Sequence, residues 1–235
     1  MIELNNVTVS YGDLKVIDDI SLTFEDNKVT CIIGRSGAGK TTLLNVIADT
    51  IQYEGTKRND GEIAYIFQNE RLIPTLTAKQ NVEYVLGNLP KAERAKLAEE
   101  MLEAVNLKEF MNNYPHTLSG GMQQRVSMAR AFAYKSDILL VDEPFKGLDI
   151  VLTERLTALF NKMLEQNKKT VVYVTHNIGE ALLIADRIIV LSSYPAKIVY
   201  DVPLTSDKKG RTPIDADLSA IRNEVYAKLK ENTRE

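Results

Sequence analysis

The sequence predicts an α/β domain with a mainly parallel central sheet, an antiparallel β part and a helical insertion. Three observations favour this fold class. Short apolar strands alternate with helical segments, which is typical of a parallel sheet covered by helices on both faces. The first strands instead show the period-2 alternation of antiparallel strands with one buried face. Between roughly residues 75 and 118 the pattern changes to helix.

The first part of the chain contains most of the strand signals. Ile20, Leu22 and Phe24 share one face, and the continuous apolar run that ends at Gly34 indicates a strand buried on both faces. The Asn59-Asp60-Gly61 turn introduces a further strand that stops at Gln68. The expected elements are, in order, strands at 2–10, 20–24 and 29–33, a helix at 40–49 and a strand at 62–67.

The insertion and the last part of the chain follow. In the insertion, Pro90 fits a first helical turn, and an apolar stripe consists of Leu97, Met101, Leu102 and Val105. The later elements are strands at 138–141, 170–174 and 187–191, helices at 150–165 and 179–185, and a closing helix with Leu218, Ile221, Val225 and Leu229 on one face. We expect one domain over residues 1–235, with a core of 1–75 and 119–235 and a helical subdomain of 76–118.

Composition excludes several classes of protein. The 235 residues carry a net charge of -3, which argues against binding to nucleic acid through a bulk positive field. A single cysteine, Cys31, excludes an internal disulfide and is expected to pack in a strand. No apolar run approaches the roughly 18 residues of a membrane span, and the N-terminus lacks a signal-peptide pattern, so we expect a cytoplasmic protein. The basic cluster 208–211 is interpreted as a solvated loop.

A glycine-rich loop follows the apolar strand at 29–33. Residues 34–41 match G-x-x-x-x-G-K-[ST], in which glycines let the backbone N–H groups converge on phosphate oxygens. Lys40 can reach the terminal phosphates, and the Thr41 hydroxyl can bind Mg²⁺. A chance match is the alternative, but the flanking strand and helix are the context that this mechanism requires. The expected phosphate-binding residues are Gly34, Arg35, Ser36, Gly37, Ala38, Gly39, Lys40, Thr41 and Thr42.

Two carboxylates end the apolar run at 138–141. Asp142 would hold Mg²⁺, and Glu143 would act as the general base that polarises the attacking water. Alone, the pattern would favour a strand that runs into a solvated turn. With a phosphate loop upstream, the pair indicates hydrolysis of a nucleoside triphosphate, because ligands bind at the carboxyl ends of parallel strands.

A third motif covers Leu118 to Arg125, where Ser119, Gly120 and Gly121 open a helix. By itself the motif could be a plain helix N-cap. In this order and spacing, however, the three motifs resemble the nucleotide-binding subunit of ATP-binding-cassette (ABC) transporters, over nearly the whole chain. The resemblance implies the P-loop NTPase fold of ABC ATPases and a head-to-tail homodimer. In that dimer, the loop at 119–121 would face the ATP held by the other subunit.

Four further residues gain roles from the resemblance. Tyr11 resembles the aromatic residue that stacks on adenine, although a strand-end core tyrosine is the alternative. Gln68 resembles the glutamine that contacts Mg²⁺ and water and begins the segment that touches the membrane subunit. His176 resembles the switch histidine at the γ-phosphate. Asp149 ends the stretch Gly147-Leu148-Asp149, which resembles the loop through which the two subunits sense each other.

Two other positions are interpreted differently. His116, just before the third motif, is expected to be structural. Lys146 departs from the family pattern, because related importers often have a small residue there, which leaves the contacts of that turn open.

The function that the resemblance implies is an ATPase, with ATP and Mg²⁺, that powers a separate transmembrane permease from the inner face of the membrane. A substrate-binding protein would be an indirect partner, and nucleic acid is not expected. The stretches 68–74, 142–145 and 198–204 are similar to importers of the nitrate, sulfonate and taurine group, whose relatives also carry vitamin precursors. Two alternatives are a soluble machine acting on DNA ends or ribosomes, and a non-catalytic clamp. The soluble machine would be favoured by two cassettes in one chain, a long coiled coil or basic extensions. The non-catalytic clamp would be favoured by the loss of Glu143 or His176, and both are present.

Overall fold

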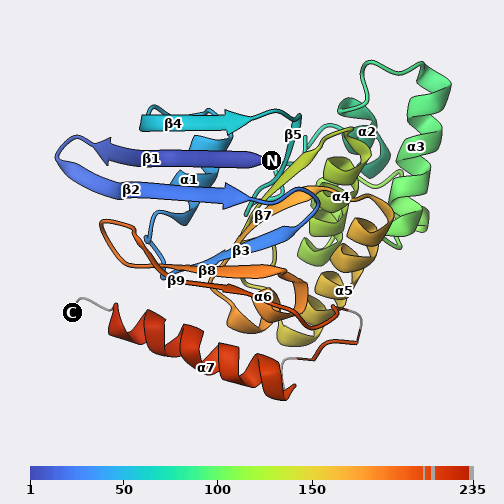
Figure 1. Cartoon of the computed structure of the whole chain (residues 1–235). Helices are drawn as coiled ribbons and strands as arrows, with labels where there is room; N and C mark the ends of the chain where they lie inside the picture. The colour runs from blue at the N-terminus through green and yellow to red at the C-terminus, as the bar shows by residue number, and fades with distance from the viewer. Residues whose placement is uncertain (209, 213–214, 233–235) are drawn as a thin grey trace. The chain divides into compact units, whose positions relative to one another are not determined.

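The computed structural model describes residues 1–208, 210–212 and 215–232. It contains two compact units, the first formed by residues 1–61 and 169–235 and the second by residues 62–168 (Figure 1). In the described part of the chain, no helix is both long and apolar enough to cross a membrane.

The first unit contains an antiparallel sheet in the order β2-β1-β4. Its strands are β1 (Ile2–Tyr11), β2 (Leu14–Phe24) and β4 (Glu54–Asn59). Ile2 pairs with Phe24 and Leu4 with Leu22, so the apolar positions of the two alternating patterns meet on one face. Strand β4 was not expected from the sequence, because its residues are polar and largely exposed and carry no apolar alternation.

Four more strands of the first unit pair in the order β7-β3-β8-β9. They are β3 (Val29–Ile33), β7 (Thr170–Thr175), β8 (Arg187–Leu191) and β9 (Ile198–Pro203). Strand β3 is parallel to both β7 and β8 and is fully buried, which confirms the prediction from its continuous apolar run. Strand β9 is antiparallel to β8 and was not predicted.

In the described residues of the first unit, the helices are α1 (Lys40–Ile47), α6 (Ile178–Ile184) and α7 (Ala216–Glu231). Helix α7 contacts α6, β8 and β9 (Figure 1). Leu218 and Val225 are the buried residues of its predicted apolar stripe. Cys31 is fully buried in β3, and burial raises the pKa of its thiol well above the usual value, as fits a packing residue.

The interpretation of the basic cluster 208–211 as a solvated loop was wrong for Arg211. That side chain is 7% exposed, and its Nη1 donates hydrogen bonds to the carbonyls of Leu182 and Ala185, at 2.9 and 2.8 Å. These carbonyls close α6 and need donors, which an arginine can supply from outside the helix. Lys208 forms an ion pair with Asp186, and Lys209 lies outside the described residues.

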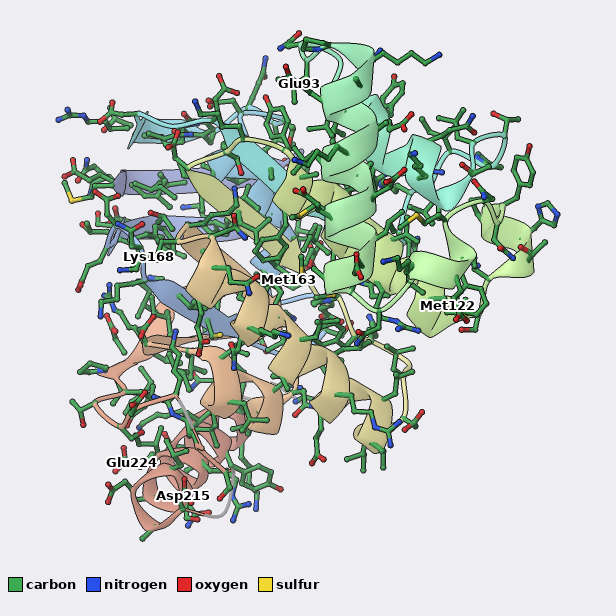
Figure 2. All side chains as sticks on the ribbon, turned by 90° about the vertical axis from the view of Figure 1, so that its right-hand side faces the viewer. Glu93, Met122, Met163, Lys168, Asp215 and Glu224 are labelled. Carbon is green, nitrogen blue, oxygen red and sulfur yellow. The ribbon has the colours of Figure 1, made fainter. Side chains whose placement is uncertain are left out.

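The second unit contains the parallel strands β5 (Ile63–Ile66) and β6 (Ile138–Asp142), together with five helical segments and α5 (Ile150–Gln166). The helical segments are α2 (Ala78–Tyr84), α3 (Lys91–Ala104), η1 (Lys108–Phe110), η2 (Pro115–Thr117) and α4 (Gly120–Ala133). Figure 2 shows α3, α4 and α5 with Glu93, Met122 and Met163 on them.

Helix α4 lies at the centre of the second unit's helical packing, because it contacts α2, α3, α5 and β5. Nine of its residues are buried, which explains its low amphipathicity. On α3, Leu102 is buried within the predicted stripe, and Pro90 is the residue that precedes the helix. His116 is exposed, and its ring stacks on that of Tyr114.

Candidate nucleotide site

The loop between β3 and α1 has the backbone of an anion cradle. Gly37 and Gly39 have φ of +84° and +78°, a region that other residues rarely adopt. Gly39 is also the N-cap of α1, so the loop runs directly into the unpaired N–H groups at a helix start. Arg35, Ser36 and Gly37 are exposed, so this face of the loop is open to a ligand.

Lys40 is held against the same loop. Its side chain is 5% exposed, and Nζ donates hydrogen bonds to the carbonyl oxygens of Gly34 and Arg35, both at 2.9 Å. The positive end of α1 adds to the charge of the ammonium group, so the site attracts anions with several negative oxygens. Thr41, the next residue, is exposed.

Two segments distant in sequence support the loop from behind. A β-carbon placed on Gly39 would lie 3.2 Å from Val16 Cγ1 and 3.4 Å from Ala196 Cβ. One placed on Gly37 would lie 3.6 Å from the Tyr194 hydroxyl. Ala196 is itself fixed to β2, because its N–H donates to the Val16 carbonyl at 2.8 Å. No sequence signal points to Tyr194 or Ala196, since both lie in a polar turn.

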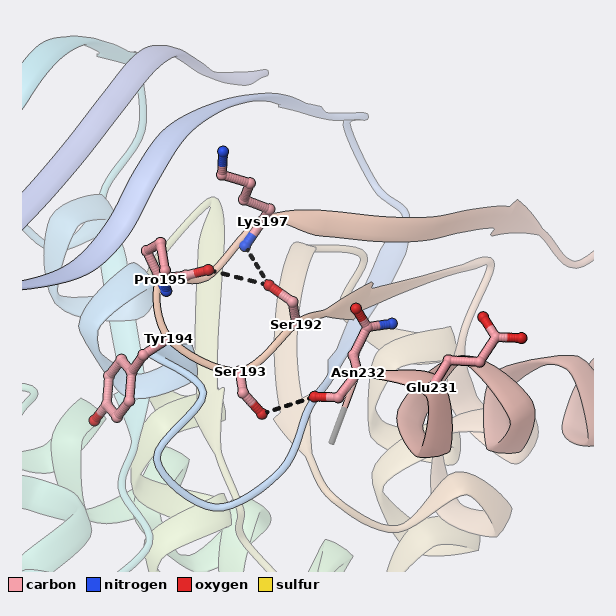
Figure 3. Close-up of a pocket in the computed structure, with 7 residues that line it drawn as sticks. All are labelled: Ser192, Ser193, Tyr194, Pro195, Lys197, Glu231 and Asn232. Carbon is pink, nitrogen blue, oxygen red and sulfur yellow. Dashed lines mark hydrogen bonds between the residues drawn. The ribbon is translucent and has the colours of Figure 1, made fainter. Parts of the chain in front are cut away.

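The turn that contains Tyr194 is itself anchored (Figure 3). The Ser192 hydroxyl donates to the Pro195 carbonyl and accepts from the Lys197 N–H, at 3.1 and 2.9 Å. The Ser193 hydroxyl donates to the Asn232 carbonyl at 3.1 Å, just after the end of α7. The turn and the end of α7 line an open pocket. The turn at residues 192–197, which lies behind the phosphate loop, is therefore held in place by its own hydrogen bonds.

His176 and Tyr11 lie in the same unit as the phosphate loop. Ile33 is the register partner of Thr175, so Gly34 and His176 follow adjacent parallel strands at one edge of the sheet. The His176 side chain is exposed there. Tyr11, at the end of β1, is 53% exposed, which excludes the alternative of a core tyrosine.

The carboxylate pair lies in the second unit with Gln68. Asp142 ends β6, and Glu143 follows with a positive φ of 42° and an exposed fraction of 8%. Ile66 is the register partner of Val141, so Gln68 leaves the neighbouring strand at the same edge. Burial, and then the charge of Asp142, raises the pKa of Tyr65 on β5.

Lys146, whose contacts the sequence left open, pairs with the candidate general base. Its Nζ lies 3.1 Å from Glu143 Oε2, three residues earlier in the chain. Lys146 is largely exposed, so the pair is screened by water and contributes little to stability. Its position nevertheless places a positive charge beside this carboxylate.

Well-defined contacts hold the segment that follows Gln68. Arg130 on α4 donates from its two terminal nitrogens to the carbonyls of Glu70 and Arg71, both at 2.8 Å. Buried Asn81 on α2 accepts from the Ile73 N–H and donates to the Ile73 carbonyl. The segment is therefore tied to the helical part of the second unit.

The third motif forms the start of α4. Ser119 caps the helix, because its hydroxyl accepts from the Met122 N–H at 3.3 Å, so the N-cap interpretation holds for this residue. A β-carbon placed on exposed Gly120 would meet nothing within 4 Å, whereas one on Gly121 would lie 2.9 Å from Leu152 Cδ2 on α5. A glycine is therefore needed at position 121 so that α4 can pack against Leu152, whereas the space beside Gly120 is open to a ligand. Asp149 is exposed and caps α5 through the Leu152 N–H.

Comparison with known proteins decides the family. The family described as "ABC transporter" matches residues 17–146. The taurine import ATP-binding protein TauB of Escherichia coli strain K12 is 36% identical over 215 residues, which cover 87% of this chain and 84% of that protein. The protein of the same name from Shigella sonnei strain Ss046 matches equally.

The chain belongs to the ABC transporter family.

Solved structures agree. A dimeric ATP-binding cassette in a post-hydrolysis state, bound to ADP and Pi, has a TM-score of 0.77 and 33% identity over 88% of this chain and 100% of that chain. A dimeric bacterial ABC transporter cassette has a TM-score of 0.77 and 34% identity at the same coverage. The α/β fold class is thus confirmed, and this ABC cassette is an ATPase that binds ATP.

The two units of the cassette contribute different candidate residues. The first carries Tyr11, Gly34, Arg35, Ser36, Gly37, Ala38, Gly39, Lys40, Thr41, Thr42 and His176, and the second carries Gln68, Ser119, Gly120, Gly121, Asp142, Glu143 and Asp149. Within the described residues, no cluster of three His, Cys, Asp or Glu side chains could hold a metal ion. The candidate Mg²⁺ ligands Thr41, Gln68 and Asp142 are oxygen donors, which suit Mg²⁺ together with substrate phosphates.

We predict that Gly39→Ala destabilises the cassette more than Gly210→Ala. Both glycines have similar φ, +78° and +80°, so each alanine costs about 1–2 kcal/mol in backbone strain. Only at Gly39 does the new methyl group also meet Val16 and Ala196, whereas nothing lies within 4 Å at Gly210. Urea unfolding of the two variants measures the difference. Equal losses would mean that the contacts behind the phosphate loop do not constrain it.

Proposed function

We propose that this cassette is the ATP-driven motor of an importer, which closes as a homodimer around two ATP molecules and acts on a separate transmembrane permease. The observation that carries the proposal is the phosphate loop with Lys40 bound against its carbonyls, together with a carboxylate pair that ends a parallel strand. The dimeric state of the solved relatives supports the assembly.

The loop at residues 34–42 would hold the phosphates through its N–H groups and Lys40. Tyr11 would stack on adenine, which its exposed ring permits. Bound Mg²⁺, held by Thr41, Gln68 and Asp142, would neutralise charge on the β- and γ-phosphates. In this arrangement Glu143 accepts a proton from the attacking water, Gln68 orients that water, and His176 contacts the γ-phosphate.

The second copy would complete each site. Ser119, Gly120 and Gly121 open α4, and their exposed N-terminal face suits the γ-phosphate of an ATP held by the partner copy. Asp149, at the exposed start of α5, would sense that copy. The division into a core of 1–75 and 119–235 and a helical subdomain of 76–118 follows the same proposal, with residues after Gln68 and the helices contacting the permease at the inner face of the membrane.

We predict that Glu143→Gln abolishes ATP turnover while ATP binding persists, because the amide cannot accept the proton from water but keeps the size of the side chain. A loss of at least about 100-fold in kcat is expected for a general base. The same variant should elute as a dimer in ATP and as a monomer in ADP during size-exclusion chromatography. Lys162→Gln, on the exposed side of α5, is the matched control. Normal hydrolysis by Glu143→Gln would rule out the assigned base.

A sulfonate of the taurine type is the proposed cargo. The taurine import ATP-binding proteins, each 36% identical to this chain, support it, as do the stretches 68–74 and 198–204. The residues of the cassette do not themselves contact the cargo, so nitrate and vitamin precursors of the same group are the competing outcomes.

We predict that deletion of the gene from its host removes the uptake of radiolabelled taurine, and that wild-type protein, but not Glu143→Gln, restores it. Nitrate uptake should stay unchanged. Normal taurine uptake in the deletion strain, with loss of nitrate or vitamin-precursor uptake, would contradict the cargo and leave the motor intact.

A further inference from the structure

A buried carboxylate lies just beyond the candidate switch histidine. The mechanism proposed above does not use it. Glu180, in the first turn of α6, is 6% exposed. Burying a carboxylate is costly unless hydrogen bonds to its oxygens offset the loss of water. Two hydroxyl groups of β7 supply such bonds: Tyr173 donates to Oε1, and Thr175 donates to Oε2 at 2.8 Å.

Both hydroxyl groups are suited to this task. Tyr173 is fully buried, and burial, followed by the negative charge of Glu180, raises the pKa of its phenol well above the usual value. The phenol therefore stays protonated and donates. A threonine hydroxyl has one proton to donate and lone pairs left to accept. Thr175 uses both, because its oxygen also accepts from the Asn177 N–H at 3.0 Å.

These bonds close a ring around His176. The Asn177 N–H donates to Thr175, the Thr175 hydroxyl donates to Glu180, and the Glu180 N–H donates to Asn177 Oδ1 at 3.2 Å. In a capping box the glutamate at this position accepts directly from the N-cap N–H. Here the threonine hydroxyl is inserted between them, so the ring reaches back into β7 and includes the backbone on both sides of His176.

The imidazole of His176 is exposed, whereas its neighbours in the chain are fixed by this ring. The backbone turn between β7 and α6 therefore sets where this side chain starts and which way its Cα–Cβ bond points. A misplacement of about 1 Å in a group that acts on the transition state can cost about 100-fold in rate.

We propose that Glu180 is a positioning residue, which acts through Thr175 to hold the turn that aims His176 at the γ-phosphate. Loss of this role lowers kcat but does not change ATP affinity, because the phosphate loop determines that affinity. This inference rests on the proposed role of His176.

The main test is ATP hydrolysis by Glu180→Gln. The amide keeps the size of the side chain but has no charge and can accept from only one of the two hydroxyl groups, so the charge-assisted bond from Thr175 is weakened. We expect kcat to fall about tenfold or more, with less than about a twofold change in ATP affinity. Glu180→Gln should cause no further loss in a His176→Ala background, because it acts through that residue.

One matched pair at Thr175 and one variant of Tyr173 separate positioning from stability. Thr175→Val removes the hydroxyl and should reproduce the fall in kcat, whereas Thr175→Ser keeps it and should restore most of the rate. Tyr173→Phe removes the hydrogen bond from the Tyr173 hydroxyl to Glu180 Oε1, which is not part of the ring. It should lower thermal stability while kcat stays within about twofold of wild type.

A spectroscopic readout follows the histidine itself. The chain has two histidines, so the imidazole signals of His176 can be assigned by NMR with His116→Gln as the reference. Thr175→Val and Glu180→Gln should shift them, and Tyr173→Phe should not.

The outcomes separate this inference from the proposed function. Full activity of His176→Ala would contradict the role of the histidine itself. A slow His176→Ala beside a normal kcat for Glu180→Gln would overturn the positioning role alone. If Glu180→Gln does not fold, the Thr175 pair decides: equal rates for valine and serine would also overturn it.

Discussion

The geometry of the phosphate loop is the constraint on which the candidate site depends. Gly37 and Gly39 need a left-handed backbone, and this conformation lets Lys40 fold back onto the carbonyls of Gly34 and Arg35. The loop does not keep this shape alone. Val16 and Ala196 lie directly behind Gly39, and the serine-rich turn that carries Ala196 is anchored to the end of α7. A local sequence motif thus relies on residues far away in the chain.

Strand register supplies the second requirement. Pairing of Ile33 with Thr175 brings the phosphate loop and His176 to one edge in the first unit. Pairing of Ile66 with Val141 does the same for Gln68 and the carboxylate pair in the second. In both cases residues distant in sequence become neighbours because parallel strands end together. The ring of hydrogen bonds around His176 then fixes a turn that register alone would leave adjustable.

The sequence predicted the elements whose burial is uniform. The continuous apolar runs located β3 and β8 to the residue, and the glycine-lysine motif located α1, because both signals depend on local chemistry. Strand β4 escaped prediction because it is polar and exposed, and β9 because it is at best half buried. Arg211 was misinterpreted because its partners are carbonyls of α6, which leave no trace in the side-chain pattern. No local signal marked Tyr194 and Ala196, because they lie in a polar turn, or Glu180, because its partners are hydroxyl groups of the preceding strand.

The central claim is that this loop binds the triphosphate through Lys40. Isothermal titration of wild type and Lys40→Ala with Mg-ATP tests it directly, with Lys91→Ala on α3 as the control for loss of a lysine. The loss of a charge-assisted hydrogen bond to phosphate, about 1.5–3 kcal/mol, predicts an affinity roughly 10- to 150-fold weaker for Lys40→Ala and unchanged for Lys91→Ala. Equal affinities of Lys40→Ala and wild type would contradict the account.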